Sequence, residues 1–214
     1  MDYPEHDTYS ILYARYLAPA RTAQLVELAG PLEKARILDL CGGGGRLARY
    51  AAGLGAEVLI VDESAPMSQA CGVQWLHASV EKALPRLPCN FDAVLCQQAV
   101  NYWMSLEMAE AVARVLKAGG RFVFNTFNRK PSAAPSVKQY VLNERHYAEI
   151  SWLRDGFVEH VQTCEGYPPH TTRFQWISPE MFQAWLGPWF EVTELQEGAT
   201  SVWVCIRKGS CSAL

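Results

Sequence analysis

Four consecutive glycines, residues 42–45, constrain this chain more than any other feature. Each glycine in a helix interior costs about 1 kcal/mol relative to alanine, and glycine also weakens strands, so the run fits neither element. It follows the short apolar segment 36–40 and precedes residues 46–53, whose apolar side chains recur at helical spacing. The run therefore predicts a strand-to-helix loop whose backbone a ligand approaches closely, because no Cβ atoms stand in the way.

Apolar strands alternate with helix-length segments on both sides of this loop. The further strands are predicted at 57–61, 73–77, 91–96 and 121–125. The helices are predicted at 64–71 and 106–116, and Gly119-Gly120 ends the second one. This alternation is typical of an α/β fold with a Rossmann-like, doubly wound, mostly parallel sheet.

From Lys130 onward the pattern becomes typical of antiparallel structure. Residues 147–152 and 157–161 alternate polar and apolar side chains around Arg154-Asp155-Gly156, which predicts a hairpin. The remaining predicted elements are a third strand at 171–177, a helix at 179–186 and a closing antiparallel strand pair at 189–195 and 201–207.

Composition narrows the possible functions. With 50% hydrophobic and 19% charged residues, the 214-residue chain is not intrinsically disordered. A net charge of −3 argues against a nucleic-acid partner. We expect no membrane span, because no apolar stretch approaches about 20 residues. The acidic N-terminus lacks a secretory signal, and the seven cysteines include no CxxC pair, which favours a cytoplasmic location and no metal site.

Two classes of ligand fit the glycine loop. Gly43-x-Gly45-x-x-Ala48 matches the dinucleotide fingerprint, with Asp62 near the spacing of a ribose-binding acid, which would suit an NAD(P)-dependent oxidoreductase. Asp39 separates the two classes, because a carboxylate beside the loop repels a pyrophosphate and attracts a cation. S-adenosylmethionine carries an ammonium group, a sulfonium and a free ribose, so it fits both acids.

These residues resemble the motifs of the class I S-adenosylmethionine-dependent methyltransferases over about residues 8–128. Asp39-x-Cys41-x-Gly43-x-Gly45 is similar to the family's acid-x-Gly-x-Gly-x-Gly, with Cys41 in place of the first glycine, a mild change if Cys41 has a negative φ. The other matching motifs are Asp62, His77-Ala78 followed by Ser79, Phe91-Asp92-Ala93-Val94 and Leu116-x-x-Gly119-Gly120.

The resemblance implies both a domain plan and a cofactor site. Residues 1–214 form one domain, with N-terminal lid helices in 1–30, a cofactor-binding core at 36–128, an antiparallel substrate cap at about 140–178 and closing elements at 179–207. The implied S-adenosylmethionine contacts are Tyr13, Arg15, Asp39, Cys41, Gly42, Gly43, Gly45, Asp62, Glu63, Met67, Ala78, Ser79 and Gln97.

The segment after the fourth strand bears on the acceptor. Residues 97–103 lack the Asn/Asp-Pro-Pro-Tyr sequence typical of members that methylate amides or nucleobases, which favours a small-molecule acceptor. The predicted substrate contacts are Tyr9, Asn101, Tyr102, Trp103 and His146. The predicted catalytic residues are His170, which follows Pro168-Pro169 on an expected rigid loop, and Tyr102.

The resulting hypothesis is methyl transfer from S-adenosylmethionine to a nitrogen or oxygen of a small metabolite or natural-product intermediate, by a monomer or homodimer. Three alternatives stay open at this point. They are an NAD(P)-dependent oxidoreductase, a protein that binds S-adenosylmethionine without methylating, and arsenic methylation through Cys164, Cys205 and Cys211.

Overall fold

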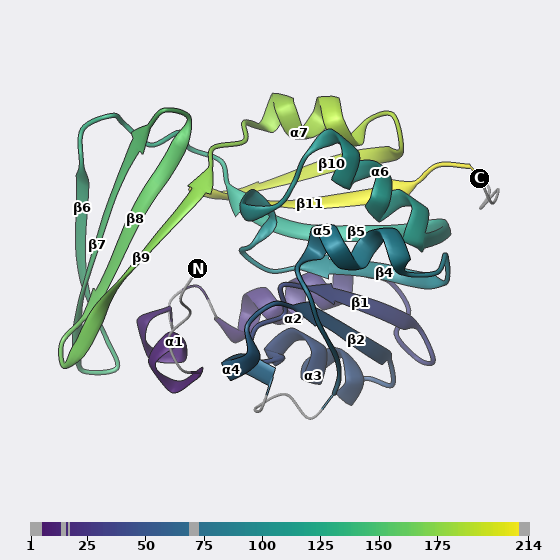
Figure 1. The fold of residues 1–214 in the computed structure, drawn as a ribbon, viewed down its shortest axis with the longest axis horizontal. Coiled ribbons are helices and arrows are strands. Elements are labelled where there is room, and N and C mark those ends of the chain that lie inside the picture. The colour runs from purple at the N-terminus through teal and green to yellow at the C-terminus, as the bar shows by residue number, and fades with distance from the viewer. Residues whose placement is uncertain (1–5, 14–15, 17, 69–72, 210–214) are drawn as a thin grey trace.

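The computed structural model describes residues 6–13, 16, 18–68 and 73–209. Its main sheet has seven strands in the order β10-β11-β5-β4-β1-β2-β3 (Figure 1). The strands are β1 (Arg36–Leu40), β2 (Glu57–Asp62), β3 (Gln74–His77), β4 (Phe91–Cys96), β5 (Leu116–Phe127), β10 (Phe190–Glu197) and β11 (Thr200–Arg207). Strands β1 to β5 pair in parallel, whereas β11 runs antiparallel to both β5 and β10. The predicted fold class is therefore confirmed.

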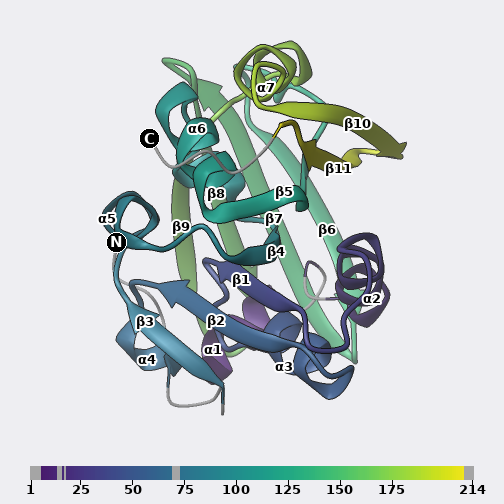
Figure 2. The same cartoon turned by 90° about the vertical axis from the view of Figure 1, so that its right-hand side faces the viewer.

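Helices cover both faces of this sheet, as the view along its edge shows (Figure 2). On one face lie α2 (Pro19–Leu28) and α3 (Arg46–Gly53), and on the other lie α5 (Val80–Ala83), α6 (Leu106–Val115) and α7 (Pro179–Leu186). The remaining helical elements are α1 (His6–Leu12), α4 (Ala65–Ser68) and the short 3-10 turns η1 (Leu84–Arg86) and η2 (Val100–Tyr102). No helix among the described residues has the length and apolar character to cross a bilayer.

The alternation of side chains in the strands builds two separate cores. On β1, Leu38 and Leu40 join the core beneath α5, α6 and α7, while Ile37 joins the core beneath α2 and α3. Because successive strand residues point to opposite faces, a strand covered on both sides must be apolar throughout. This explains the short apolar segments of the sequence.

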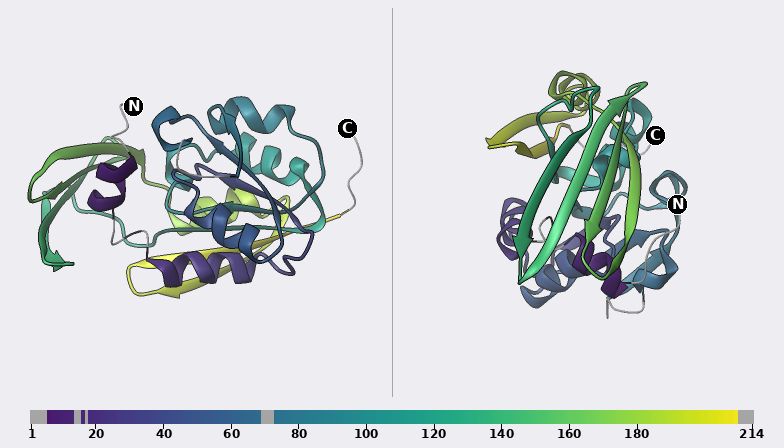
Figure 3. Two further views of the ribbon diagram at one scale, coloured as in Figure 1. Left: turned by 90° about the horizontal axis from the view of Figure 1, so that it is seen from below. Right: turned by 90° about the vertical axis from the view of Figure 1, so that its left-hand side faces the viewer.

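A second sheet of four antiparallel strands stands beside the α/β body (Figure 1; Figure 3, right). It consists of β6 (Ser136–Leu142), β7 (Arg145–Arg154), β8 (Phe157–Cys164) and β9 (Tyr167–Gln175), and we call it the cap. The predicted hairpin is confirmed: Asp155 and Gly156 have φ of +51° and +80°, as a two-residue turn between β7 and β8 requires. Helix α1 packs against the cap through Leu12.

Three strands differ clearly from the sequence predictions. Strand β6 has no predicted counterpart, because this edge strand is exposed over most of its length and lacks an apolar alternation. Strand β5 begins at Leu116, not at residue 121: Leu116 pairs with Phe91 of β4, and residues 117–120 bulge out before pairing resumes between Arg121 and Ala93. Strand β9 begins at Tyr167, so His170 lies within this strand and not on the predicted loop.

The closing strand β11 is anchored by a fully buried tryptophan. The Trp203 ring stacks on Phe124 with centroids 5.9 Å apart and lies 5.4 Å from the ring of Phe182 on α7. We predict that Trp203→Ala lowers the free energy of unfolding in urea by about 3–5 kcal/mol, through lost burial and a cavity. Leu195→Ala, at an exposed position of neighbouring β10, is the control and should change it by less than about 1 kcal/mol.

Candidate active site

A cavity of about 200 Å³ lies at the carboxyl ends of β2 and β4 and is closed on the other side by α1 and the cap. This is where ligands bind in open α/β sheets. It brings together most of the residues predicted from the sequence: Tyr9, Tyr13, Cys41, Gly43, Asp62, Glu63, Met67, Ala78, Ser79, Gln97, Asn101, Tyr102, Trp103 and His170. Segments more than 150 residues apart in the chain therefore share one site.

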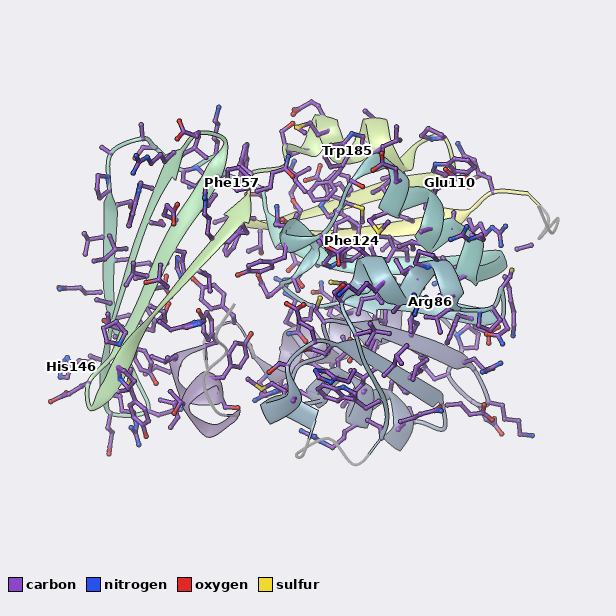
Figure 4. All side chains as sticks on the ribbon, viewed as in Figure 1. Arg86, Glu110, Phe124, His146, Phe157 and Trp185 are labelled. Carbon is purple, nitrogen blue, oxygen red and sulfur yellow. The ribbon has the colours of Figure 1, made fainter. Side chains whose placement is uncertain are left out.

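Four of the predicted residues that the structure describes are not part of the cavity lining. Asp39, Gly42 and Gly45 lie behind the lining in the strand end and loop, and Arg15 lies outside the described residues. The prediction that His146 contacts the substrate is not supported. His146 is exposed at the outer end of β7, beside the turn at residues 143–144 and away from the α/β body (Figure 4).

Asp62 ties the glycine loop to the end of β2. Its Oδ2 accepts a hydrogen bond from the Gly43 N–H at 2.9 Å, and its Oδ1 accepts one from the Ser64 N–H at 2.8 Å. The Cys41 N–H donates to the Val61 carbonyl at 2.7 Å, next to this pair. Each carboxylate oxygen keeps a further lone pair, and Asp62 itself lines the cavity. Asp62 can therefore hold the loop in place and at the same time accept hydrogen bonds from ligand hydroxyl groups.

Asp39 also constrains the loop, because its side chain lies close to Gly42. A Cβ atom at Gly42 would lie 2.7 Å from Asp39 Oδ2 and 2.8 Å from Ile60 Cγ2, so glycine is required there for space. At Gly43, where φ is +51°, a Cβ atom would meet no protein atom within 4 Å. A side chain at Gly43 would instead take up space that a ligand can use. The two glycines thus serve different purposes, close packing at Gly42 and ligand approach at Gly43.

Cys41 has a left-handed backbone, with a φ of +57°. Cysteine in place of glycine was expected to be a mild change if its φ were negative. The φ is positive, so that expectation is wrong. The left-handed conformation costs a residue with a Cβ atom about 1–2 kcal/mol. Gln98, directly after β4, has a φ of +62° and also lines the cavity. Strained backbone of this kind concentrates at functional sites.

Burial raises the pKa of both acids. Asp39 is 1% exposed, and burial, together with the charge of Asp62, raises its pKa to about 8. Burial also raises the pKa of Asp62, but the two backbone N–H donors oppose that shift. Asp39 is therefore largely neutral at pH 7 in the free protein. The sequence argument that the Asp39 charge selects the ligand is corrected, because Asp62 is the carboxyl that faces the cavity.

The wall opposite the loop is held by side-chain hydrogen bonds. Tyr13 Oη and His170 Nδ1 lie 2.6 Å apart and join α1 to the cap. Thr22 Oγ1 donates to Gln97 Oε1 at 3.1 Å. Asn101 accepts a bond from Thr126 at 2.6 Å and donates to the Gln175 carbonyl at 3.2 Å, so its amide positions the cap on the body.

Some lining residues were not among those predicted from the sequence. They are Tyr16, Ser64, Val80, Glu81, Gln98, Ala99, Phe127, His160, Thr172 and Phe174. Several come from the inner face of the cap strands. The alternation of β8 and β9 identifies a buried face, but no sequence signal says that this face meets the ends of β2 and β4.

A second, larger cavity of about 970 Å³ adjoins the first. The two share Tyr16, Gln98, Phe127, His160 and Phe174. The larger one extends between the cap, α2 and the β10–β11 turn. The two cavities are therefore neighbours, with these five residues lining both.

The described residues hold no cluster of three His, Cys, Asp or Glu side chains that could bind a metal. Cys164 packs with Leu12 at the cap, whereas Cys205 lies in the core of the main sheet. Cys164 and Cys205 are therefore not close enough to form the thiol cluster that arsenic methylation needs, which contradicts that alternative for these two cysteines. Cys211 lies outside the described residues.

Comparison with known proteins agrees with this architecture. Residues 38–124 match the methyltransferase domain family. Ubiquinone biosynthesis O-methyltransferase of Alkalilimnicola ehrlichii is 34% identical over 125 residues, which are 54% of this chain and 51% of that protein. The chain thus spans about half the length of the curated relatives it matches.

Two solved structures resemble nearly the whole chain. The CcbJ methyltransferase from Streptomyces caelestis has a TM-score of 0.73 at 17% identity, covering 90% of this chain and 91% of that one. S-adenosylmethionine-bound CalS10, an amino pentose methyltransferase from Micromonospora echinaspora, has a TM-score of 0.70 at 16% identity, covering 92% of each chain.

The strand order, the glycine loop and the cap give this chain the fold of these methyltransferase structures. Residues 38–124, which include the glycine loop and Asp62, match the methyltransferase domain family. The resemblance seen in the sequence is confirmed.

The strain at Cys41 is testable by comparing two small replacements. Cys41→Gly and Cys41→Ala both remove the sulfur, and only glycine relieves the left-handed conformation. We predict that Cys41→Gly is more stable than Cys41→Ala by about 1 kcal/mol in urea unfolding. Equal stability of the two variants would contradict the assigned backbone conformation.

The raised pKa of Asp39 predicts a specific pH dependence of stability. The folded protein keeps a proton on Asp39 that the unfolded chain releases above its ordinary pKa, so the free energy of unfolding falls from about pH 4 to pH 8. Asp39→Asn should remove this part of the slope when urea midpoints are compared at pH 5, 6, 7 and 8. Parallel curves for the two proteins would refute a proton held on Asp39.

Proposed function

We propose that this protein transfers a methyl group from S-adenosylmethionine to a nitrogen or oxygen atom of a small metabolite or natural-product intermediate. The observation that carries the proposal is Asp62. It fixes the glycine loop through the Gly43 N–H and faces a cavity between the sheet and an aromatic cap. The O-methyltransferase and amino pentose methyltransferase named above support the same kind of acceptor.

The residues fit this cofactor. Gly43 leaves open space where a Cβ atom would project, and Asp62 has carboxylate lone pairs left for ribose hydroxyls. The acidic surroundings of Asp62 and Glu63 suit a ligand with net positive charge. The further residues that would hold the cofactor are Tyr13, Cys41, Met67, Ala78, Ser79 and Gln97.

The sulfonium cofactor supplies an activated methyl group when bound. The protein then has to align the acceptor and exclude water, which can contribute roughly 7–11 kcal/mol. Tyr102 and Trp103 from η2, with Tyr9 from α1, form an aromatic wall suited to a small acceptor. We propose His170, held by Tyr13, and Tyr102 as residues that contact the acceptor.

The proposal further includes a monomer or homodimer without a nucleic-acid partner, in the cytoplasm. Light scattering of the purified protein tests the first point.

Two other functions make different predictions for ligand binding. An NAD(P)-dependent oxidoreductase would bind NADH, and a protein that only binds S-adenosylmethionine would form no methylated product. Calorimetry with S-adenosylmethionine, S-adenosylhomocysteine and NADH separates the first case. Incubation of metabolite fractions with methyl-labelled cofactor, followed by mass spectrometry, separates the second and identifies the acceptor. Binding of NADH alone would overturn the proposal.

Asp62 is the sharpest test of the cofactor site. We predict that Asp62→Ala weakens S-adenosylmethionine binding by about 1.5–3 kcal/mol, because hydrogen bonds to a charged group are lost. Asp62→Asn is the matched control: it keeps an acceptor oxygen at Oδ1 or Oδ2 and removes the charge, so it should lose less affinity. Titration calorimetry measures both, and unchanged affinity in the alanine variant would exclude Asp62 from the site.

A further inference from the structure

A chain of hydrogen-bonded side chains runs along the inner face of the cap. Tyr140 Oη on β6 donates to Glu149 Oε1 on β7 at 2.8 Å. Gln162 Nε2 on β8 donates to Tyr140 Oη at 3.1 Å, and its Oε1 lies 3.2 Å from His160 Nε2. Glu149, His160 and Gln162 are all buried. Burying this many polar groups is costly unless they bond to each other, so the chain forms a connected unit.

The donor and the acceptor of every hydrogen bond in this series follow from Glu149, which stands at one end of it. An ionised carboxylate only accepts hydrogen bonds, so Glu149 makes Tyr140 the donor. The Tyr140 oxygen then accepts from the amide nitrogen of Gln162, which turns the amide oxygen of Gln162 toward the imidazole. Because that oxygen also only accepts, His160 must carry its proton on Nε2. The basic lone pair of neutral His160 is therefore on Nδ1.

His160 stands in the wall between the two cavities and lines both. Its Nδ1 makes no hydrogen bond to the described residues. The ring of Tyr16 lies 6.3 Å from the His160 ring, and Thr172 is its partner on β9. The charge that acts on His160 is that of Glu149 on β7, whose cross-strand neighbour on β6 is Lys138. On β9, His170 pairs with Gln162, two residues from His160. A basic nitrogen is thus available where the cavities meet.

The protonation state of His160 allows it to accept a proton. Burial lowers the pKa of His160, while the Glu149 charge opposes that shift. His160 is therefore neutral near pH 7 and able to take up a proton. His170 differs, because its Nδ1 bonds to the Tyr13 hydroxyl, which can either donate or accept, so this contact by itself does not fix the His170 tautomer.

We propose that His160 is the general base for an acceptor whose nucleophilic nitrogen or oxygen carries a proton, with Gln162, Tyr140 and Glu149 as positioning residues. This inference rests on the proposed function. As the acceptor atom bonds to the methyl carbon, the bond of that carbon to sulfur breaks, and its electron pair stays on sulfur. The acceptor proton passes to His160 Nδ1 and then to solvent through the larger cavity.

The first experiment needs no acceptor. The protein is prepared with ¹⁵N-labelled histidine, and the five imidazoles are observed by NMR, with His160→Gln assigning the His160 signals. We expect a neutral ring at pH 7 with its proton on Nε2, and a pKa below the ordinary value. Glu149→Gln should lower that pKa further, because a negative charge is removed. A proton on Nδ1, or a charged ring at pH 7, would overturn the proposal.

The second experiment uses the acceptor found by the labelled-methyl screen. His160→Gln keeps an N–H group for Gln162 but has no basic atom, so kcat should fall by roughly 10²-fold or more. It should also lose the acid limb of the kcat–pH profile, while S-adenosylmethionine binding stays unchanged. Tyr140→Phe should reduce kcat less and leave KM near the wild-type value. His146→Gln, an exposed cap histidine outside both cavities, is the control with unchanged kcat.

The failure of this inference is distinct from failure of the proposed function. If the wild-type protein does not bind S-adenosylmethionine at all, the methyltransferase proposal is excluded, and the proposal that His160 is the base is excluded with it. Normal cofactor binding with a wild-type kcat in His160→Gln would remove only His160 as the base. The NMR result decides the tautomer in either case.

Discussion

The contact between Asp62 and the glycine loop is the interaction on which the site depends. The Asp62 carboxylate accepts N–H groups from Gly43 on one side and Ser64 on the other, so it joins the ends of β1 and β2 into one rim. This geometry needs a left-handed backbone at Cys41 and no Cβ atom at Gly42, where Asp39 and Ile60 leave no room. The strain at Cys41 is tolerated because the Cys41 N–H is bonded to Val61 and the strand is buried on both faces.

The cap supplies what the rim lacks. The rim offers backbone amides and carboxyl groups, which suit a polar, positively charged ligand, whereas β8 and β9 of the cap contribute the imidazoles of His160 and His170 and the ring of Phe174. Asn101 connects the two parts through bonds to Thr126 of β5 and to the Gln175 carbonyl of β9. The loop and the cap are thus separate parts of the structure that Asn101 helps to join. The divided architecture agrees with the comparisons, in which the family match is confined to residues 38–124.

Prediction from sequence succeeded where local patterns set the structure. β1, β4, α3 and α7 have the predicted bounds, because short apolar runs and helical periodicity are read within a few residues. The Asp155-Gly156 turn followed from its residue types alone. Strand β6 was missed because its side chains are exposed and carry no alternation. His146 lies at the outer end of the cap, whereas His160 lies at the cavity wall, and no local pattern distinguishes these two positions.

The sequence by itself determined the order of the elements, the loop of four glycines and the acid at the end of β2, since each depends on neighbouring residues along the chain. Only the tertiary structure decided which carboxyl faces the ligand and which histidine carries a defined tautomer. Asp39 and Asp62 differ in burial, which depends on the packing of two strands and the loop. The proton position on His160 depends on residues of three different strands brought into contact by antiparallel pairing. Such properties come from distances across the fold, which no local pattern records.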